Sequence, residues 1–429
     1  MSDWSLAIDF GTCFTTAAVR AEPAGGVGGA AGAGTPGVGA VRSATVPAGT
    51  VPPGTVTAVE IENSRYLPSL VCVDGDGRLL TGRAAVQLAA QRPERAEHHP
   101  KRALLRQPEV LLDDREVDTV ALVAAVLARA ADGARARQGG TVPARIVLTH
   151  PADWSPPDLD RLVEAAALAG LAGPELLPEP VAAARFHAAH PMAGGEEEAG
   201  DGPIAVYDLG GGTVDTAVLR RERGGFRTVA VGGDPDFGGR DLDQVLYELL
   251  RDRALDLDPG PWERLRTDPT PVGAHQRAQL AREVTLAKEA LSETGTVELA
   301  VPGYPDRFVV QGQEYRAAVT PALAASVGLL ERTLARAGVT AAELGAVVLC
   351  GAAARTPAVG DLIAARLGTA RLRLSEDPKA VVVLGALTEP PPPPGTDEGA
   401  GEQEAETADA PARWAVLHYR DEVDPGLSF

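Results

Sequence analysis

A pattern of buried strand, aspartate and glycine turn occurs twice in this chain, at Ala7–Cys13 (AIDFGTC) and at Val206–Thr213 (VYDLGGGT). Glycine lets the backbone turn tightly and approach a ligand, so the N–H groups and hydroxyls of each turn are free to hold phosphate oxygens. Asp9 and Asp208 cannot bind phosphate directly, because both groups are anions. They are predicted to face a cation, Mg²⁺, through its bound water. Two such hairpins related by a pseudo-twofold axis predict two matched halves that clamp a polyphosphate.

Strand and helix patterns alternate around the two copies, which indicates an α/β architecture. Arg145–Thr149 and Ala346–Leu349 are short apolar strands. Helical apolar spacing covers Thr119–Arg137, Asp158–Leu171 and Glu179–Ala189. A chain of 429 residues is also too long for one core, since domains mostly take about 100–200 residues.

The composition changes along the chain predict the domain boundaries. The first lobe is expected over residues 1–195, with a flexible Gly/Ala/Pro insertion at 24–57, and the second over 196–388. The acidic, glycine-rich segment 192–202 is expected to connect them. Residues 389–429 contain five consecutive prolines, which exclude a helix or a central strand, and ten Asp or Glu against two Arg. They predict a Pro-rich, acidic, disordered tail.

Charge and cysteine content narrow the partners and the compartment. The net charge of −19 argues against nucleic acid or an anionic membrane as the main partner. Cys13, Cys72 and Cys350 lie far apart and form no C-x-x-C pair, which fits a reducing compartment. The start, Met1–Trp4, lacks the basic and long apolar regions of a signal peptide, and no apolar stretch is long enough to cross a bilayer. We expect a cytoplasmic protein.

Lysine is rare in this chain. Of the 40 basic residues only Lys101, Lys288 and Lys379 are lysines, and the others are arginines. Lysine carries a compact charge on a flexible side chain, whereas the guanidinium group of arginine is planar and branched. Arginine therefore cannot replace lysine at a site that needs a compact charge. A functional role at each lysine and retention by chance are equally good explanations for any single position.

Several further segments accompany the two hairpins, and they follow one another in the order Tyr66–Ser69, His150–Ala152, Leu176–Ala184, Gly232–Asp243, Ala287–Ser292 and Gly351–Pro357. Together with Ala7–Thr12 and Asp208–Asp215 they resemble the ATPase domain of the DnaK-type heat-shock chaperones, the Hsp70 family, in the actin and sugar-kinase superfamily. The resemblance runs from about residue 5 to 388. It implies an actin-like ATPase fold of two ribonuclease H-like lobes around a nucleotide cleft, with 375–388 packing back on the first lobe.

The resemblance also implies ATP or ADP with Mg²⁺ as ligands. Lys101 would touch the γ-phosphate, Glu179 would position the attacking water, and Asp9 and Asp208 would complete the catalytic set. Asp9, Asp208 and Asp215 would orient the metal through water. Phosphoryl transfer needs mainly positioning and charge stabilisation, so this set suffices for slow hydrolysis. The implied nucleotide contacts are Gly11, Thr12, Cys13, Gly210, Gly211, Gly212, Thr213, Asp215, Gly238, Gly239, Lys288, Ser292, Gly351, Arg355 and Asp377.

The sequence departs from the family pattern mainly where the base would bind. Cys13 replaces a hydroxyl residue and offers only a weak thiol donor to phosphate. At the base end Glu289 stands where the family has the arginine that stacks on adenine, and Lys379 replaces an aspartate. Thr285 replaces an acid, and Ala352 and Ala353 replace a glycine and a serine. The resemblance therefore implies a preserved phosphate end, and a base that is held differently or more weakly.

Three functions remain open. The first is an Hsp70-like ATPase without a peptide-binding domain, since residues after 388 are not expected to form one, acting on an unknown protein partner through its lobes or tail. The second is a nucleotide-sensing regulatory or scaffold protein with little or no hydrolysis, favoured by Cys13 and the altered base end. The third is a metabolite kinase of the same superfamily, which Glu179 and the chaperone-like motifs make the least favoured.

Overall fold

The computed structural model describes residues 4–21, 54–190, 202–223, 225–368 and 371–389, which lie in one compact unit of the chain. The predicted insertion up to residue 53, the connecting segment up to residue 201 and the tail from residue 390 fall outside these residues. What the sequence predicts for those stretches stays a prediction.

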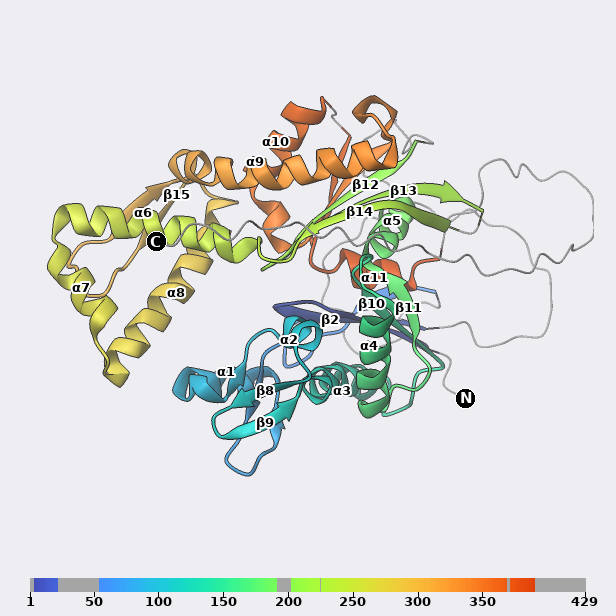
Figure 1. Ribbon diagram of the computed structural model, residues 1–429, viewed down its shortest axis with the longest axis horizontal. Coiled ribbons are helices and arrows are strands. Elements are labelled where there is room, and N and C mark those ends of the chain that lie inside the picture. Colours follow the sequence, from blue (N-terminus) through green and yellow to red (C-terminus); the bar gives the residue numbers. More distant parts are fainter. Residues whose placement is uncertain (1–3, 22–53, 191–201, 224, 369–370, 390–429) are drawn as a thin grey trace, which may run out of the picture. The chain divides into compact units, whose positions relative to one another are not determined.

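Two sheets with the same strand order form the centre of the fold (Figure 1). In each sheet the central strand pairs in parallel with one neighbour and antiparallel with the other. The repeat in the sequence is therefore a repeat in the fold, and the predicted α/β class with two matched halves is confirmed. The first sheet runs β11 (Glu175–Pro178), β10 (Arg145–His150), β1 (Trp4–Phe10), β2 (Phe14–Ala21), β3 (Val56–Ala58). The second runs β18 (Leu372–Leu374), β17 (Ala346–Cys350), β12 (Ile204–Leu209), β13 (Val214–Glu222), β14 (Gly225–Asp234).

The register places the two aspartates at equivalent points. Asp9 is the next-to-last residue of β1 and lies opposite Thr149 of β10. Asp208 is the next-to-last residue of β12, opposite Cys350 of β17, and on its other side it faces Asp215 of β13. Parallel strands end at one edge of a sheet, so each half presents a carboxylate at the edge where its glycine turn begins.

Long helices cover the outer faces of the sheets. In the first half α3 (Thr119–Arg137) packs on β1 and β2, beside α4 (Pro156–Leu168). Asp118 caps its start by accepting a hydrogen bond from the backbone N–H of Val120. In the second half α9 (Gly312–Ala337) runs along β13 and β14 (Figure 1), and Gly338 caps its end with φ 61°. Each half thereby has its own apolar core.

Two helices, α5 (Glu179–Ala189) and α11 (Val381–Leu387), share a third core with both sheets. α11 packs against β1, β2 and β10 of the first sheet and against α5. The approach is so close that a Cβ on Gly385 would lie 1.9 Å from the carbonyl oxygen of Ala182. Only glycine fits there, and the contact holds α11 against α5. α11 follows the second sheet in sequence but lies on the first.

The other elements are short sheets and helices that extend the two halves. In the first half these are β4 (Leu67–Pro68), β5 (Val71–Val73), β6 (Leu79–Leu80), α1 (Gly82–Gln91), η1 (Pro93–Arg95), β7 (Ala96–Glu97), α2 (Pro100–Arg106), β8 (Glu109–Leu112) and β9 (Arg115–Asp118). In the second they are α6 (Gly239–Leu257), α7 (Pro259–Thr267), α8 (Pro271–Leu291), β15 (Thr296–Leu299), β16 (Phe308–Gln311), η2 (Ala341–Glu343), η3 (Ala352–Arg355) and α10 (Pro357–Leu367).

Most element boundaries agree with the sequence-based prediction to within one residue, and two differ by more. The helix predicted over Asp158–Leu171 spans Pro156–Leu168, because Ser155 and Asp158 cap its start and Gly170 turns the chain with φ 72°. The insertion predicted over 24–57 also overlaps β3, since Val56–Ala58 adds to the edge of β2. Among the residues described, no helix has the length and apolar character needed to span a membrane.

Candidate functional site

The two glycine turns face each other across a pocket. A Cβ on Gly11 would lie 2.3 Å from the carbonyl oxygen of Phe14, so the first turn is too tight for any other residue. Ser69, just after β4, stabilises it by donating its side-chain hydroxyl to the carbonyl of Gly11 (2.7 Å) and its N–H to that of Cys13 (3.0 Å). A Cβ on Gly211 of the second turn would lie 2.6 Å from the Cys13 sulfur. The thiol therefore lies directly against the opposite turn.

Three half-buried carboxylates, those of Asp9, Asp208 and Asp215, line this pocket. Burial, with the nearby charge of Glu179, raises the pKa of Asp9 to about 6, although Thr149 donates a hydrogen bond to it (2.7 Å). Burial and the same charge raise the pKa of Asp215 to about 7. The pKa of Asp208 is raised well above its usual value, first by burial and then by the carboxylates around it. This arrangement of like charges is destabilising by itself and calls for a cation.

Lys101 and Glu179 form an ion pair beside these carboxylates. Lys101 is the second residue of α2 and Glu179 the first of α5, and Nζ donates to Oε1 at 2.8 Å. The ammonium also lies 5.6 Å from the ring centroid of Trp154, and Lys101 is only 8% exposed. Burial lowers the pKa of Lys101, but the charges of Glu179 and Asp9 outweigh that effect and raise it overall. The lysine is therefore a fixed, fully charged cation.

The carboxylates fit a metal held through water rather than by direct ligation. Within the described part of the chain, no three His, Cys, Asp or Glu side chains converge closely enough to hold an ion alone. Oxygen donors that leave most coordination positions to water and phosphate suit Mg²⁺, which is dehydrated reluctantly. Asp9, Asp208 and Asp215 are the residues that fit this role.

The start of α6 is fastened to the second turn. Its first two N–H groups, from Gly239 and Arg240, donate to the carbonyls of Gly210 and Gly211. Gly238 lies against the backbone of the turn, where a Cβ would come within 2.5 Å of the Gly212 Cα. A side chain on Gly238 would therefore prevent the second turn from lying against the start of α6.

Lys288 and Gly351 support the same region. Lys288 of α8 donates to the carbonyl of Gly239 (2.9 Å) and pairs with Asp243 (2.7 Å). Gly351 has φ 78°, and a Cβ on it would lie 2.5 Å from Oδ1 of Asp208. The segment after β17 can therefore pass over the Asp208 carboxylate only if residue 351 is glycine.

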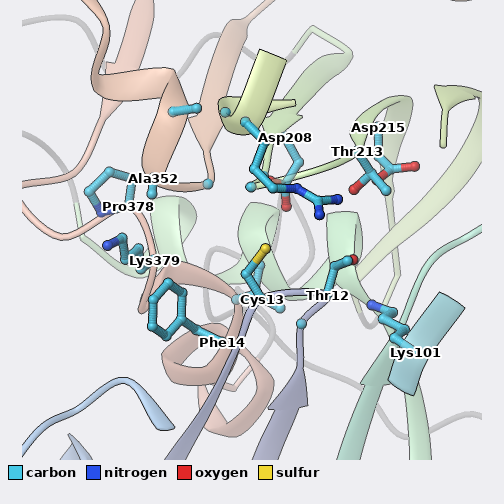
Figure 2. Close-up of a pocket in the computed structure, with 18 of the residues that line it drawn as sticks. Thr12, Cys13, Phe14, Lys101, Asp208, Thr213, Asp215, Ala352, Pro378 and Lys379 are labelled. Carbon is cyan, nitrogen blue, oxygen red and sulfur yellow. The ribbon is translucent and has the colours of Figure 1, made fainter. Parts of the chain in front are cut away.

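The far end of the pocket, where the base is expected, is built around Lys379. Its ammonium pairs with Glu289 of α8 (3.7 Å) and lies 5.2 and 4.9 Å from the ring centroids of Phe14 and Tyr66. Tyr66 in turn donates to Asp377 at 2.5 Å. Figure 2 shows Lys379 with Phe14 at one end of the pocket and Lys101 at the opposite end. Glu289 and Lys379, which depart from the family pattern at the base end, thus compensate each other's charge.

The cavity between the halves has a volume of about 700 Å³ and contains most of the predicted site residues. All three lysines of the chain line it, which favours a functional explanation for the retention of lysine. Of the predicted residues, Gly212, Gly238 and Asp377 are not part of the lining: the two glycines lie against each other, and Asp377 accepts from Tyr66. The predicted residues in the lining are Asp9, Gly11, Thr12, Cys13, Lys101, Glu179, Asp208, Gly210, Gly211, Thr213, Asp215, Gly239, Lys288, Ser292, Gly351 and Arg355.

Some lining residues were not predicted as site residues. Trp154 and Phe14 lie near the ammonium groups of Lys101 and Lys379, and Arg102 and Arg240 lie against Gly212 of the second glycine turn. Arg102, Phe14 and Arg240 directly follow predicted site residues, so adjacency was an available signal for all three. The position of Trp154 depends on tertiary contacts that no local pattern reports.

The chain is similar to known proteins over most of its length. A sequence model of the family described as Hsp70 protein matches residues 97–389. The chain is similar to the chaperone protein HscA homolog of Azotobacter vinelandii, with 33% identity over 355 residues, which cover 76% of this chain and 52% of that protein. It is also similar to the chaperone protein HscA of Pectobacterium carotovorum, with 31% identity over 358 residues, which cover 77% of this chain and 53% of that protein. The chain spans about half the length of these curated relatives.

Proposed function

The chain belongs to the Hsp70 family, and from this premise we propose that it binds Mg²⁺-ATP between its two halves and hydrolyses it slowly to ADP and phosphate. The proposal concerns the nucleotide cleft, because the chain spans only about half of the relatives it matches. The proposal also includes a protein partner that recognises the lobes or the acidic tail, and a cytoplasmic location.

The observation that carries the proposal is the ion pair of Lys101 and Glu179, which lines the same cavity as the two glycine turns. The Lys101 ammonium stabilises charge on the transferred phosphoryl group, and the Glu179 carboxylate orients the attacking water. Bound Mg²⁺ would supply charge neutralisation at the phosphates. The acids Asp9, Asp208 and Asp215 would hold its water ligands.

The test is phosphate release from ATP at high enzyme concentration, with Mg²⁺ and with EDTA. We expect slow release that requires Mg²⁺ and is lost in Asp208→Asn. If wild-type protein binds Mg²⁺-ATP but releases no phosphate over many hours, hydrolysis is refuted while binding is retained.

A nucleotide sensor with little hydrolysis is the second candidate. It is favoured by Cys13, which lies against Gly211 where a hydroxyl is expected, and by the Glu289–Lys379 pair at the base end. The substitution Cys13→Thr tests it. If the thiol limits catalysis, the threonine variant gains phosphate release while its nucleotide affinity changes little. Equal release by both proteins counts against a sensor that Cys13 keeps inactive.

A further inference from the structure

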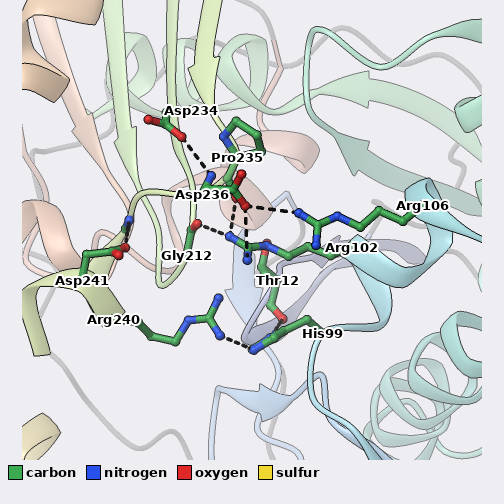
Figure 3. Close-up of polar contacts among 11 residues, drawn as sticks. Thr12, His99, Arg102, Arg106, Gly212, Asp234, Pro235, Asp236, Arg240 and Asp241 are labelled. Carbon is green, nitrogen blue, oxygen red and sulfur yellow. Dashed lines mark hydrogen bonds and ion pairs between the residues drawn. The ribbon is translucent and has the colours of Figure 1, made fainter. Parts of the chain in front are cut away.

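Two arginines from opposite halves of the molecule meet at one glycine of the second turn. A Cβ on Gly212 would lie 2.5 Å from Nη2 of Arg240 and 3.0 Å from Nη2 of Arg102. Arg102 comes from α2, next to Lys101, and donates to the carbonyls of Gly212 and Pro235. Arg240 comes from the first turn of α6, whose N–H groups bind the same turn. Figure 3 shows both guanidinium groups beside Gly212.

The charges around this glycine are unbalanced. Arg240 donates to Nε2 of His99, and burial together with the charge of Arg240 lowers the pKa of His99 to about 4, so the ring is a neutral acceptor. Among the described residues no carboxylate forms an ion pair with Arg240. The carboxylate of Asp236 is 4.0 Å from Arg102 and is shared with Arg106 at 3.2 Å. Two guanidinium groups at one point, with one exposed and shared carboxylate, leave a net positive charge.

This positive charge faces the cavity. Arg102 and Arg240 both line it, next to Cys13, Gly211 and Lys101. The planar fork of a guanidinium matches the geometry of phosphate oxygens and binds them through two parallel hydrogen bonds. The N–H groups of the backbone turn are neutral donors, so they cannot compensate the full negative charge of a phosphate group. The more negative the bound phosphate group is, the more its affinity gains from the two arginines.

We propose that Arg240, assisted by Arg102, binds the terminal phosphate of a nucleoside triphosphate and so makes the cleft prefer triphosphate over diphosphate. This inference rests on the proposed nucleotide binding and adds to it two residues and a selectivity. The ligand that it identifies is the terminal phosphate, irrespective of the base.

A purely structural role is the competing explanation. Arg102 and Arg106 of α2 contact Pro235 and Asp236, just before α6, and these contacts connect the two halves (Figure 3). Such a connection would stabilise closure around any nucleotide. A terminal-phosphate site changes the binding of triphosphate alone, so the two roles predict different ratios of affinities.

The experiment is calorimetric titration of the full chain with Mg²⁺-ADP and with the Mg²⁺ complex of a non-hydrolysable ATP analogue. The variants are Arg240→Gln, which removes the charge, Arg240→Lys, which keeps it, and the control Arg106→Gln, whose side chain contacts Asp236 outside the lining. Arg240 is exposed, and ADP binding reports whether each variant is folded. We expect Arg240→Gln to weaken the analogue about tenfold or more. ADP affinity should stay within about twofold, Arg240→Lys should be intermediate, and the control should keep the wild-type ratio.

Equal weakening of both nucleotides in Arg240→Gln, or no weakening of the analogue, would overturn the inference while leaving the proposed function intact. Loss of the preference for triphosphate in the Arg106 control would favour the structural connection and would likewise overturn the inference. Failure of the wild-type chain to bind either nucleotide would instead overturn the proposed function and the inference together.

Discussion

The ammonium of Lys101 donates to the carboxylate of Glu179 at 2.8 Å, although the two residues are 78 positions apart in the sequence. They come from the starts of α2 and α5, and both side chains are almost wholly inaccessible to solvent. A buried ion pair contributes little net stability compared with apolar residues, which favours a catalytic explanation for its presence.

Removal of either member of this pair should abolish turnover without abolishing nucleotide binding. Lys101→Ala and Glu179→Ala lose the charge stabilisation and the water positioning, so phosphate release should fall by about a hundredfold or more. Lys101→Ala also leaves Glu179 buried without its partner and should cost about 3–5 kcal/mol of the free energy of unfolding. Phosphate release, calorimetric ATP binding and urea unfolding measure the three effects. The control is Glu175→Gln, on the strand before α5 and paired with exposed Arg145; normal turnover in both alanine variants would refute the assigned roles.

The nucleotide-free protein should lose stability as the pH rises through 6 and 7. The pKa of Asp9 is raised to about 6 and that of Asp215 to about 7, against about 4 in an unfolded chain. Because the folded state binds these protons more tightly, their contribution is present below pH 4 and is lost as the carboxylates ionise. Asp215→Asn removes one ionisation and should be more stable than wild type by about 1–4 kcal/mol at pH 8, with a smaller difference at pH 5. Thermal melting in EDTA tests this; a difference independent of pH would contradict it.

The packing of α11 on α5 should depend on Gly385. The substitution Gly385→Ala places a methyl group 1.9 Å from the Ala182 carbonyl oxygen, so the helices must separate, at a cost of about 3 kcal/mol or more in the free energy of unfolding. The matched control is Gly360→Ala in α10, where the nearest atom is 3.6 Å away and the change should stabilise by up to about 1 kcal/mol. Denaturant unfolding of both variants measures these values. Equal stabilities would show that α11 does not contact α5 in this way.

The base end should bind adenine more tightly when Glu289 is replaced by arginine. The family resemblance places a stacked arginine at this position, and a cation over an aromatic ring contributes about 0.5–2 kcal/mol, or roughly 2- to 30-fold in affinity. Glu289→Arg should therefore strengthen ATP binding in calorimetry. The control is Glu283→Arg, which adds the same charge to α8 outside the lining. An equal gain in the control would show that net charge alone is responsible.

Local patterns were sufficient for the repeated hairpins and for α3 and α5. Each hairpin consists of an apolar strand, an aspartate and glycines, and all of these signals are adjacent in sequence. The long-range contacts were not predictable in this way. Trp154 beside Lys101 and the compensating charges of Glu289 and Lys379 depend on how each half folds. The meeting of Arg102 with Arg240 depends on how the two halves lie against each other.

Asp377 illustrates the same limit. Its position in the sequence suggested a nucleotide contact, but its carboxylate accepts a hydrogen bond from Tyr66 and lies outside the lining of the cavity. Tyr66 comes from a distant part of the chain, so no local signal could reveal this partner. A nucleotide contact by Asp377 remains a prediction.

The central claim is that Asp9 and Asp208, at equivalent ends of two matched strands, hold a metal-bound triphosphate between them. Calorimetric titration of ATP into the full chain, with Mg²⁺ and with EDTA, tests it most directly. We predict one ATP bound per chain with Mg²⁺, at least tenfold weaker binding in EDTA, and loss of this difference in the Asp9→Asn, Asp208→Asn double variant. Equal affinity with and without Mg²⁺ in the wild-type protein, or no binding at all, would contradict the claim.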